Sequence, residues 1–197
     1  MHFSIFILIY AQYIDAQLEV VPLETEHLYL RKVAMSDVKV IAALALDPMV
    51  NQKTGTFPIM HNEQEVQAYM LKYHIGDEKN GIEPLYPKTW VIEEKKSNRA
   101  IGIVLYEAYD THNQRAELGY ALLPEYWNHG YTTQACNAVI RYALDQGVSR
   151  IYATVDPENG ASERVLHKLN MSYEGLLRSY IIVRGERKDR KMYAIIK

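Results

Sequence analysis

The residues best suited to do chemistry lie where a predicted strand runs into a predicted helix, at positions 122–135. Gly130 precedes that helix, and Thr132 and Thr133 follow in its first turn. A first turn presents N–H groups without intrahelical partners at the positive end of the helix dipole, which favours a phosphate ligand. Gly130 allows close approach of the backbone to an anion, the threonines add hydroxyl donors, and His129 adds positive charge. Taken alone, the segment is equally consistent with an ordinary helix start.

Other reactive residue types give weaker signals. Cys136 is the single cysteine, and its neighbours at helical spacing are apolar, so we predict a buried structural thiol and not a nucleophile. One cysteine excludes an intrachain disulfide and suits a reducing compartment, so we expect a cytoplasmic protein. The seven histidines are scattered without ligand spacing, so no metal site is predicted.

The elements that must position these residues alternate in a mixed order, which predicts an α+β domain. Strands are expected at 28–33, 89–94, 100–106, 116–122 and 150–155, with two more around Arg184-Gly185-Glu186. Helices are expected at 36–46, 63–73, 132–146 and 161–169. The first is expected to end at Asp47-Pro48, and 76–87 is expected to be a loop.

The length of 197 residues fits one domain, and a net charge of −2 argues against direct nucleic-acid binding. We expect the domain at 21–197 and an apolar extension at 1–20. The apolar run at 3–11 is too short to span a bilayer. It resembles a signal-peptide core with Ala16 before a cleavage point, but no Lys or Arg precedes Arg31. An added element that packs on the domain or on a second subunit is the preferred interpretation.

Four segments, in chain order, carry a family resemblance: 23–31, 115–120, 155–166 and 169–175. With Leu23-Glu24-Thr25-Glu26-His27-Leu28-Tyr29-Leu30-Arg31 at the start and an Asp-Pro-x-Asn-x-x-Ser run from Asp156, the chain resembles the GNAT superfamily of N-acetyltransferases. Within it, the chain is similar to the RimJ/RimL branch, which acetylates protein N-termini. The family's phosphate loop, Gln/Arg-x-x-Gly-x-Gly/Ala, corresponds to residues 127–132, with Trp and Thr at its ends. The resemblance covers 23–196.

The resemblance implies a mixed, mainly antiparallel twisted sheet of about seven strands, with helices on both faces and acetyl-CoA between two splayed parallel strands, 117–122 and 150–155. Backbone at Leu122 would hold the pantetheine arm, Asn159 would hydrogen-bond it, and Ser162 would lie near the thioester sulfur or cap the following helix. The diphosphate would be held by the loop amides of Asn128, His129, Gly130, Tyr131, Thr132 and Thr133.

An amine attacks the thioester directly, so the chemistry needs a proton acceptor and an oxyanion stabiliser but no protein nucleophile. Glu117 beside Gly119 is the predicted base, acting directly or through water; the alternative is an ion pair with Arg115 or Arg164. Many relatives place a proton-donating Tyr where this chain has Leu166, so Ser162 or water would substitute, with Tyr173 as a weaker candidate.

Three functions stay open. The first is transfer to a protein or peptide N-terminus, and the second is transfer to a polyamine, an amino acid or an aminoglycoside, with Asp77, Glu78 and Glu83 in the acceptor wall. The third is a non-catalytic acyl-CoA-binding module.

The basic stretch at 184–191 is either a docking patch or a solvated strand edge. A homodimer stays open, and no membrane partner is expected.

Overall fold

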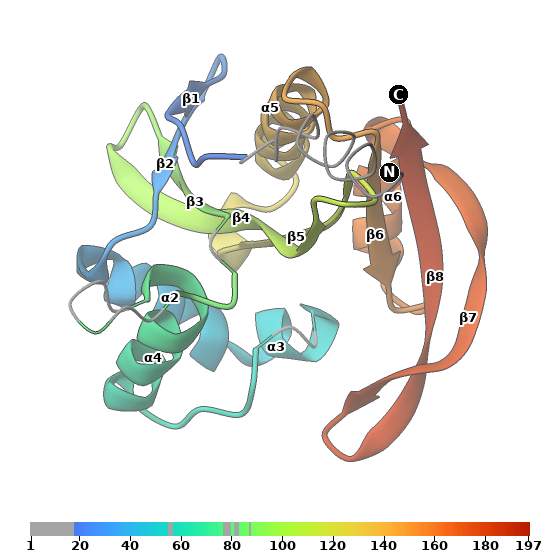
Figure 1. Cartoon of the computed structure of the whole chain (residues 1–197). Helices are drawn as coiled ribbons and strands as arrows, with labels where there is room; N and C mark the ends of the chain where they lie inside the picture. The colour runs from blue at the N-terminus through green and yellow to red at the C-terminus, as the bar shows by residue number, and fades with distance from the viewer. Residues whose placement is uncertain (1–17, 55–56, 77–79, 81–82, 87) are drawn as a thin grey trace, which may run out of the picture.

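An eight-stranded mixed sheet forms the centre of the domain, in the order β1-β2-β3-β4-β5-β6-β8-β7 (Figure 1). The computed structural model describes residues 18–54, 57–76, 80, 83–86 and 88–197. The strands are β1 (Leu23–Glu24), β2 (Leu28–Lys32), β3 (Thr89–Glu94), β4 (Arg99–Asp110), β5 (Arg115–Leu122), β6 (Arg150–Val155), β7 (Ser172–Val183) and β8 (Glu186–Ile196). Every neighbouring pair is antiparallel except β5 and β6. The predicted α+β architecture is confirmed, and the strand beyond the expected seven is the two-residue β1.

Helices cover both faces of this sheet, as the resemblance implied (Figure 1). They are α2 (Val38–Leu46), α3 (Pro48–Thr54), α4 (Glu63–Met70), α5 (Tyr131–Asp145) and α6 (Gly160–Lys168). A π-helical segment, Leu71–Ile75, continues α4, and short 3-10 turns lie at Met35–Asp37 and Pro124–Tyr126. Alternate residues of β3 enter two separate cores: Trp90 belongs to the core that includes α5 and α6, and Val91 to the core that includes α2 and α4. This alternation is what a strand buried on both faces requires.

Helix α3 was not predicted. Asp47-Pro48 does end α2, but the same two residues begin the next helix. The Asp47 carboxylate accepts hydrogen bonds from the Met49 and Val50 N–H groups at 2.7 and 3.0 Å, and Pro48 occupies the first helical position, where its missing N–H costs nothing. The Asp47-Pro48 pair therefore ends α2 and begins α3.

The packed part of the chain reaches back at least to Leu18, which is 0% exposed and belongs to the core under α5. The Trp90 indole donates a hydrogen bond to the Val21 carbonyl at 2.8 Å. This contact ties the segment before β1 to the sheet. The signal-like run at 3–11 lies outside the described residues.

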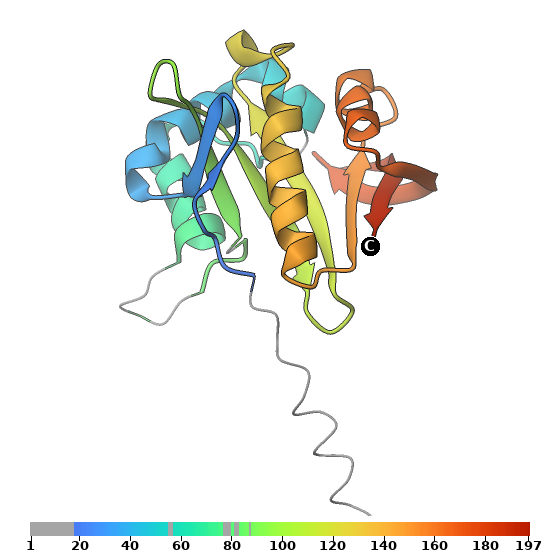
Figure 2. The ribbon, with the colours of Figure 1, turned by 90° about the horizontal axis from the view of Figure 1, so that it is seen from above.

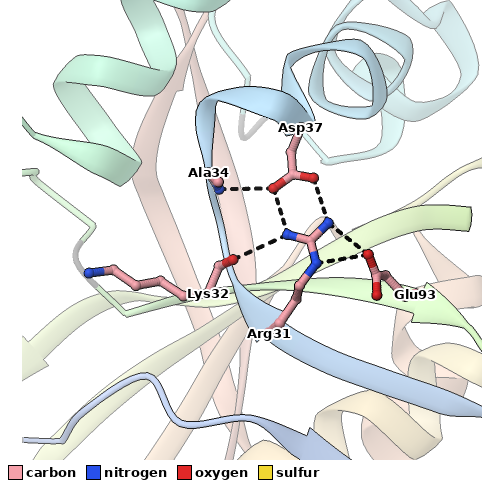
Figure 3. A network of polar contacts seen from close by, with 5 residues as sticks. All are labelled: Arg31, Lys32, Ala34, Asp37 and Glu93. Carbon is pink, nitrogen blue, oxygen red and sulfur yellow. Dashed lines mark hydrogen bonds and ion pairs between the residues drawn. The ribbon is translucent and has the colours of Figure 1, made fainter.

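One ion-pair network fastens the start of α2 to the sheet (Figure 3). The Arg31 guanidinium donates to both carboxylate oxygens of Asp37, at 2.8 and 2.7 Å, and to Glu93 at 2.8 Å. Asp37 is 4% exposed and also accepts the Ala34 N–H at 2.8 Å. The hydrogen bond to Asp37 raises the pKa of Arg31, so this cation stays charged. Two carboxylates around one guanidinium make a satisfied structural joint between β2, β3 and α2.

The parallel strands β5 and β6 pair only at their beginnings. Their register runs from Arg115 opposite Arg150 to Glu117 opposite Tyr152 and then stops, although β5 continues to Leu122 and β6 to Val155. The predicted splay is therefore present, and Glu117 is its last paired residue on β5. The starts of α5 and α6 lie at the end of the sheet where these strands finish (Figure 2).

The β7–β8 hairpin corrects the interpretation of the basic stretch at 184–191 as one patch. Arg184 and Arg187 are exposed near the turn. Arg190 is buried and paired with Asp156 at 2.9 Å, and Lys191 is paired with Glu163 at 2.9 Å. The two cations nearest the sheet are therefore structural, because each already has a carboxylate partner.

Candidate active site

A cavity of about 330 Å³ opens where β5 and β6 diverge. Its walls are the end of β5, the loop after it, the first turn of α5 and the exposed side of α6. Backbone groups along the diverging parts of β5 and β6 have no partner from each other, because the β5–β6 ladder stops at Glu117 and Tyr152. Such a gap can accept an extended ligand as an additional hydrogen-bonding partner.

The first turn of α5 lines one part of this cavity. Gly130 is its N-cap with φ of +78° and ψ of 0°, and no side chain caps the turn. The N–H groups of Tyr131, Thr132 and Thr133 precede the first intrahelical donor, that of Gln134, which bonds to the Gly130 carbonyl. A Cβ on Gly130 would meet no atom within 4 Å, so lack of space does not explain the glycine. Its left-handed φ does, because side-chain-bearing residues rarely adopt that conformation.

Most of the predicted binding residues line this one cavity. They are Leu122, Asn128, Gly130, Tyr131, Thr132, Thr133, Asn159 and Ser162. His129 does not: its exposed ring stacks on Tyr131 at 5.6 Å between centroids, and its Nδ1 lies 2.8 Å from the Trp127 carbonyl oxygen. The ring is therefore held outside the cavity lining.

Two of these residues also make hydrogen bonds that fix local structure. The Leu122 carbonyl accepts the Trp127 indole N–H at 2.7 Å, which fixes the loop between β5 and α5. The Asn159 side chain accepts the Ser162 N–H at 3.1 Å and is the N-cap of α6. The predicted capping role of Ser162 is therefore wrong: Asn159 caps the helix, and Ser162 lies in its first turn.

A second cavity of about 90 Å³ adjoins the first. Tyr120, Asn159 and Ser162 line both, so the two spaces adjoin at these three residues. Its charged lining residues are three carboxylates, Glu107, Glu117 and Asp156, and one cation, Arg190, which pairs with Asp156.

Glu117 is held from β6. The Thr154 hydroxyl donates to its carboxylate at 3.0 Å, and Tyr152 adds a further side-chain hydrogen bond. Burial raises the pKa of Glu117, and these hydrogen bonds lower it by less. The alternative of an ion pair is wrong within the described residues: Arg115 pairs with Asp110 at 3.2 Å, and Arg164 lines the other cavity.

Glu107 was missed from the sequence. It is the extra residue of a bulge in β4, because Tyr106 lies opposite Leu118 while Ala108 lies opposite Glu117. Its carboxylate lies over Gly119, where an added Cβ would come within 2.4 Å of Glu107 Oε1. The space that Gly119 was expected to leave open is therefore filled by this second carboxylate. A glycine inside a strand marks such a close approach and is the one sequence signal that pointed here.

The two carboxylates affect each other. Burial and the neighbouring charge of Glu117 raise the pKa of Glu107, Arg190 lowers it, and together they bring it to about 7. Arg190 itself is paired with Asp156, so no described cation forms an ion pair with Glu107 or Glu117. A carboxyl group that titrates near neutrality is suited to proton transfer.

The structure also distinguishes the positions considered for a general acid. Leu166 is 1% exposed in the core, and Tyr173 is 53% exposed and packs against the Tyr193 ring. Tyr120, not singled out from the sequence, points its hydroxyl at the Ser162 carbonyl at 3.4 Å where the cavities adjoin. Burial raises the pKa of Tyr120, which keeps its proton in place at neutral pH.

Other sites carry no comparable chemistry. Cys136 is buried and burial raises its pKa, as expected for a structural thiol. Among the described residues, no three His, Cys, Asp or Glu side chains gather as metal ligands. No helix in that part of the chain is long and apolar enough to cross a bilayer.

Comparison with known proteins agrees with this geometry. The family model described as "Acetyltransferase (GNAT) domain" matches residues 27–172. The chain is 32% identical over 176 residues to the uncharacterized N-acetyltransferase YoaA of Bacillus subtilis (strain 168), which covers 89% of this chain and 96% of YoaA. It is 30% identical over 176 residues to the uncharacterized N-acetyltransferase p20 of Bacillus licheniformis, with the same coverage of both chains.

A solved structure of RimL, the ribosomal L7/L12 α-N-protein acetyltransferase in complex with coenzyme A, has the same fold. The TM-score is 0.74 at 22% identity, covering 90% of this chain and 98% of RimL. The chain belongs to the GNAT acetyltransferase family and is an acetyl-CoA-dependent N-acetyltransferase.

Proposed function

We propose that this enzyme moves the acetyl group of acetyl-CoA to the α-amino group of a protein or peptide N-terminus, in the crevice between β5 and β6. One observation carries the proposal: the splay joins an anion-binding helix start on one side to a pair of unpaired carboxylates on the other. The RimJ/RimL-like segment at 23–31 and the shared fold with RimL support an N-terminal amine as acceptor.

In this proposal the larger cavity holds acetyl-CoA. The diphosphate lies on the N–H groups at the start of α5, with Asn128 and the Thr132 and Thr133 hydroxyls beside it. The pantetheine arm extends along the unpaired part of β5, past Leu122 and Asn159. Its thioester then reaches Tyr120 and Ser162, where the two cavities adjoin.

The acceptor amine enters from the carboxylate side. An incoming ammonium must lose a proton before its lone pair can attack the thioester carbonyl carbon. Glu107 takes that proton, since its pKa of about 7 gives it both a charged fraction and useful basicity at neutral pH. Glu117, held by the Thr154 hydroxyl, lies in the same cavity and accepts a hydrogen bond from the ammonium, which revises our expectation that Glu117 alone is the base.

Collapse of the tetrahedral intermediate breaks the carbon–sulfur bond and releases the coenzyme A thiolate. Tyr120 is the proton donor we assign to that thiolate, because its hydroxyl keeps its proton and lies where the cavities adjoin. Ser162 lies in the same place and is the alternative donor. A weak acid suffices, because a thiol has a pKa of about 8.5.

A small-molecule amine is the second candidate acceptor. The observation that favours it is the Glu107–Glu117 pair. No described cation forms an ion pair with either residue, and the pair attracts a polyamine as well as a peptide ammonium. Of the acidic loop residues expected in the acceptor wall, Asp77 and Glu78 lie outside the described residues. The carboxylate pair also favours a catalyst over a non-catalytic acyl-CoA-binding module.

The test is a parallel screen of acetyl-CoA consumption with N-terminal peptides, polyamines, amino acids and aminoglycosides. We expect turnover with peptides, with the acetyl group found on the α-amine by mass spectrometry. Turnover with polyamines and not with peptides would mean that the acceptor is a small-molecule amine and not a peptide N-terminus. Coenzyme A binding without turnover on any amine would favour the non-catalytic module. A cytoplasmic location and a homodimer stay predictions.

A further inference from the structure

Helix α6 presents two positive charges to the larger cavity. Arg164 and Lys168 are four residues apart, so they lie on one face of the helix, and both line the cavity opposite the start of α5. Among the described residues that line it, they are the only cationic side chains. Both side chains belong to exposed residues.

These two cations differ from their neighbours in having no carboxylate partner. Lys191 pairs with Glu163, Arg190 with Asp156 and Arg150 with Glu174, whereas no ion pair of Arg164 or Lys168 occurs within the described ranges. The Arg164 side chain folds back along the helix, so that its Nη1 lies 3.6 Å from where a Cβ on Gly160 would be. The guanidinium therefore adds its charge to the positive end of α6.

The ligand of the proposed function carries phosphate in two places. Its diphosphate bridges pantetheine and ribose, and a separate phosphomonoester sits on the 3′-carbon of the same ribose. The start of α5 offers N–H and hydroxyl donors but no cation in the lining, which suits the singly charged groups of a diphosphate. A phosphomonoester carries close to two negative charges and is best met by Arg and Lys.

We propose that Arg164 and Lys168 form a phosphomonoester subsite that binds the 3′-phosphate of coenzyme A and selects it over carriers lacking that group. The inference rests on the proposed placement of acetyl-CoA in this cavity. Because both cations are exposed, their contribution is expected to weaken as salt concentration rises.

Calorimetric titration with coenzyme A and with 3′-dephospho-coenzyme A tests the subsite without any acceptor. We expect the unmodified protein to bind coenzyme A about tenfold more tightly or better, since each charge-assisted contact is a strong hydrogen bond. In the double variant Arg164→Gln, Lys168→Gln, that ratio should fall to about one, with the affinity for the dephospho form unchanged. Both substitutions fall at exposed positions, and a thermal melt checks that the fold is intact.

Arg141→Gln is the matched control. Arg141 is an exposed cation on α5 that does not line the cavity, so its loss should leave the ratio unchanged. Equal binding of both ligands by the unmodified protein would overturn the subsite while leaving the cavity as the coenzyme A site. Equal losses for both ligands in the double variant would also overturn it, because the cations would then act on the diphosphate or at long range. Binding of neither ligand would contradict the proposed function itself.

Discussion

Two pairs of carboxylates lie in or beside this sheet, and the protein surrounds them in opposite ways. Asp37 and Glu93 share the Arg31 guanidinium, with contacts of 2.7 to 2.8 Å (Figure 3). Glu107 and Glu117 line a cavity with no cation paired to either among the described residues. The first pair shares a guanidinium and fixes the start of α2 to the sheet. The second has no ion-pair partner among the described residues, and a cationic substrate would supply one.

This difference assigns roles without reference to any relative. Asp37 and Glu93 are hydrogen-bonded to one guanidinium and serve to hold elements together. A carboxylate with a pKa raised to about 7 by burial and by a neighbouring charge exchanges protons readily. Four predictions on three substitutions, from the largest expected effect to the smallest, test whether the contrast holds.

Glu107→Gln should lower turnover about 100-fold or more, the range for loss of a general base. Coenzyme A affinity should not change, because Glu107 lies outside the larger cavity. The unmodified enzyme should gain activity as pH rises through about 7, because the base form of Glu107 then accumulates, and the variant should lack this inflection. Glu26→Gln, at an exposed carboxylate, is the control. Normal turnover in Glu107→Gln would show that Glu107 is not the general base.

Arg31→Met should lower the free energy of unfolding by about 2 kcal/mol, because it leaves Asp37 buried without its cation and frees the start of α2. Turnover of the folded fraction should remain near normal, since Arg31 lines neither cavity. Urea unfolding gives the stability, and initial rates at low temperature give the turnover. Unchanged stability would contradict the structural assignment of the first pair.

Glu117→Gln should lower turnover by about tenfold and raise the Michaelis constant for the amine by less. The effect is expected to be smaller than for Glu107 because an amide still accepts the Thr154 hydroxyl and keeps the cavity shape. Steady-state kinetics with both variants gives the order. A larger loss at Glu117 than at Glu107 would reverse the roles assigned to the two residues.

The last prediction concerns stability. A carboxyl with a raised folded-state pKa stabilises the fold while protonated, and that contribution is lost as pH rises from about 4 through about 7. Glu107→Gln should therefore make the protein more stable at pH 8, on the order of 1 kcal/mol, and change little at pH 4. Thermal melts at the two pH values measure it. A destabilised variant at pH 8 would mean that Glu107 is a structural carboxylate, like Asp37 and Glu93.

The sequence predicted what local chemistry determines. A glycine before a helix, threonines in its first turn and an Asp-Pro-x-Asn run are short-range signals, and the helix start and the capped α6 follow from them. The splay and the role of the crevice came from the resemblance, and the register of β5 and β6 agrees with it.

What the sequence did not reveal depends on contacts between distant segments. Glu107 reaches the site only because a bulge shifts β4 by one residue against β5, and Gly119 makes room for it twelve residues later. The Arg31 network joins residues up to 62 positions apart. Helix α3 was missed for another reason: one Asp-Pro pair serves two helices.

A crystal structure with coenzyme A bound tests the central claim most directly. The account predicts the diphosphate on the N–H groups at the start of α5 and the thiol beside Tyr120 and Ser162, facing Glu107. A carrier bound elsewhere, with the gap between β5 and β6 empty or closed, would contradict it.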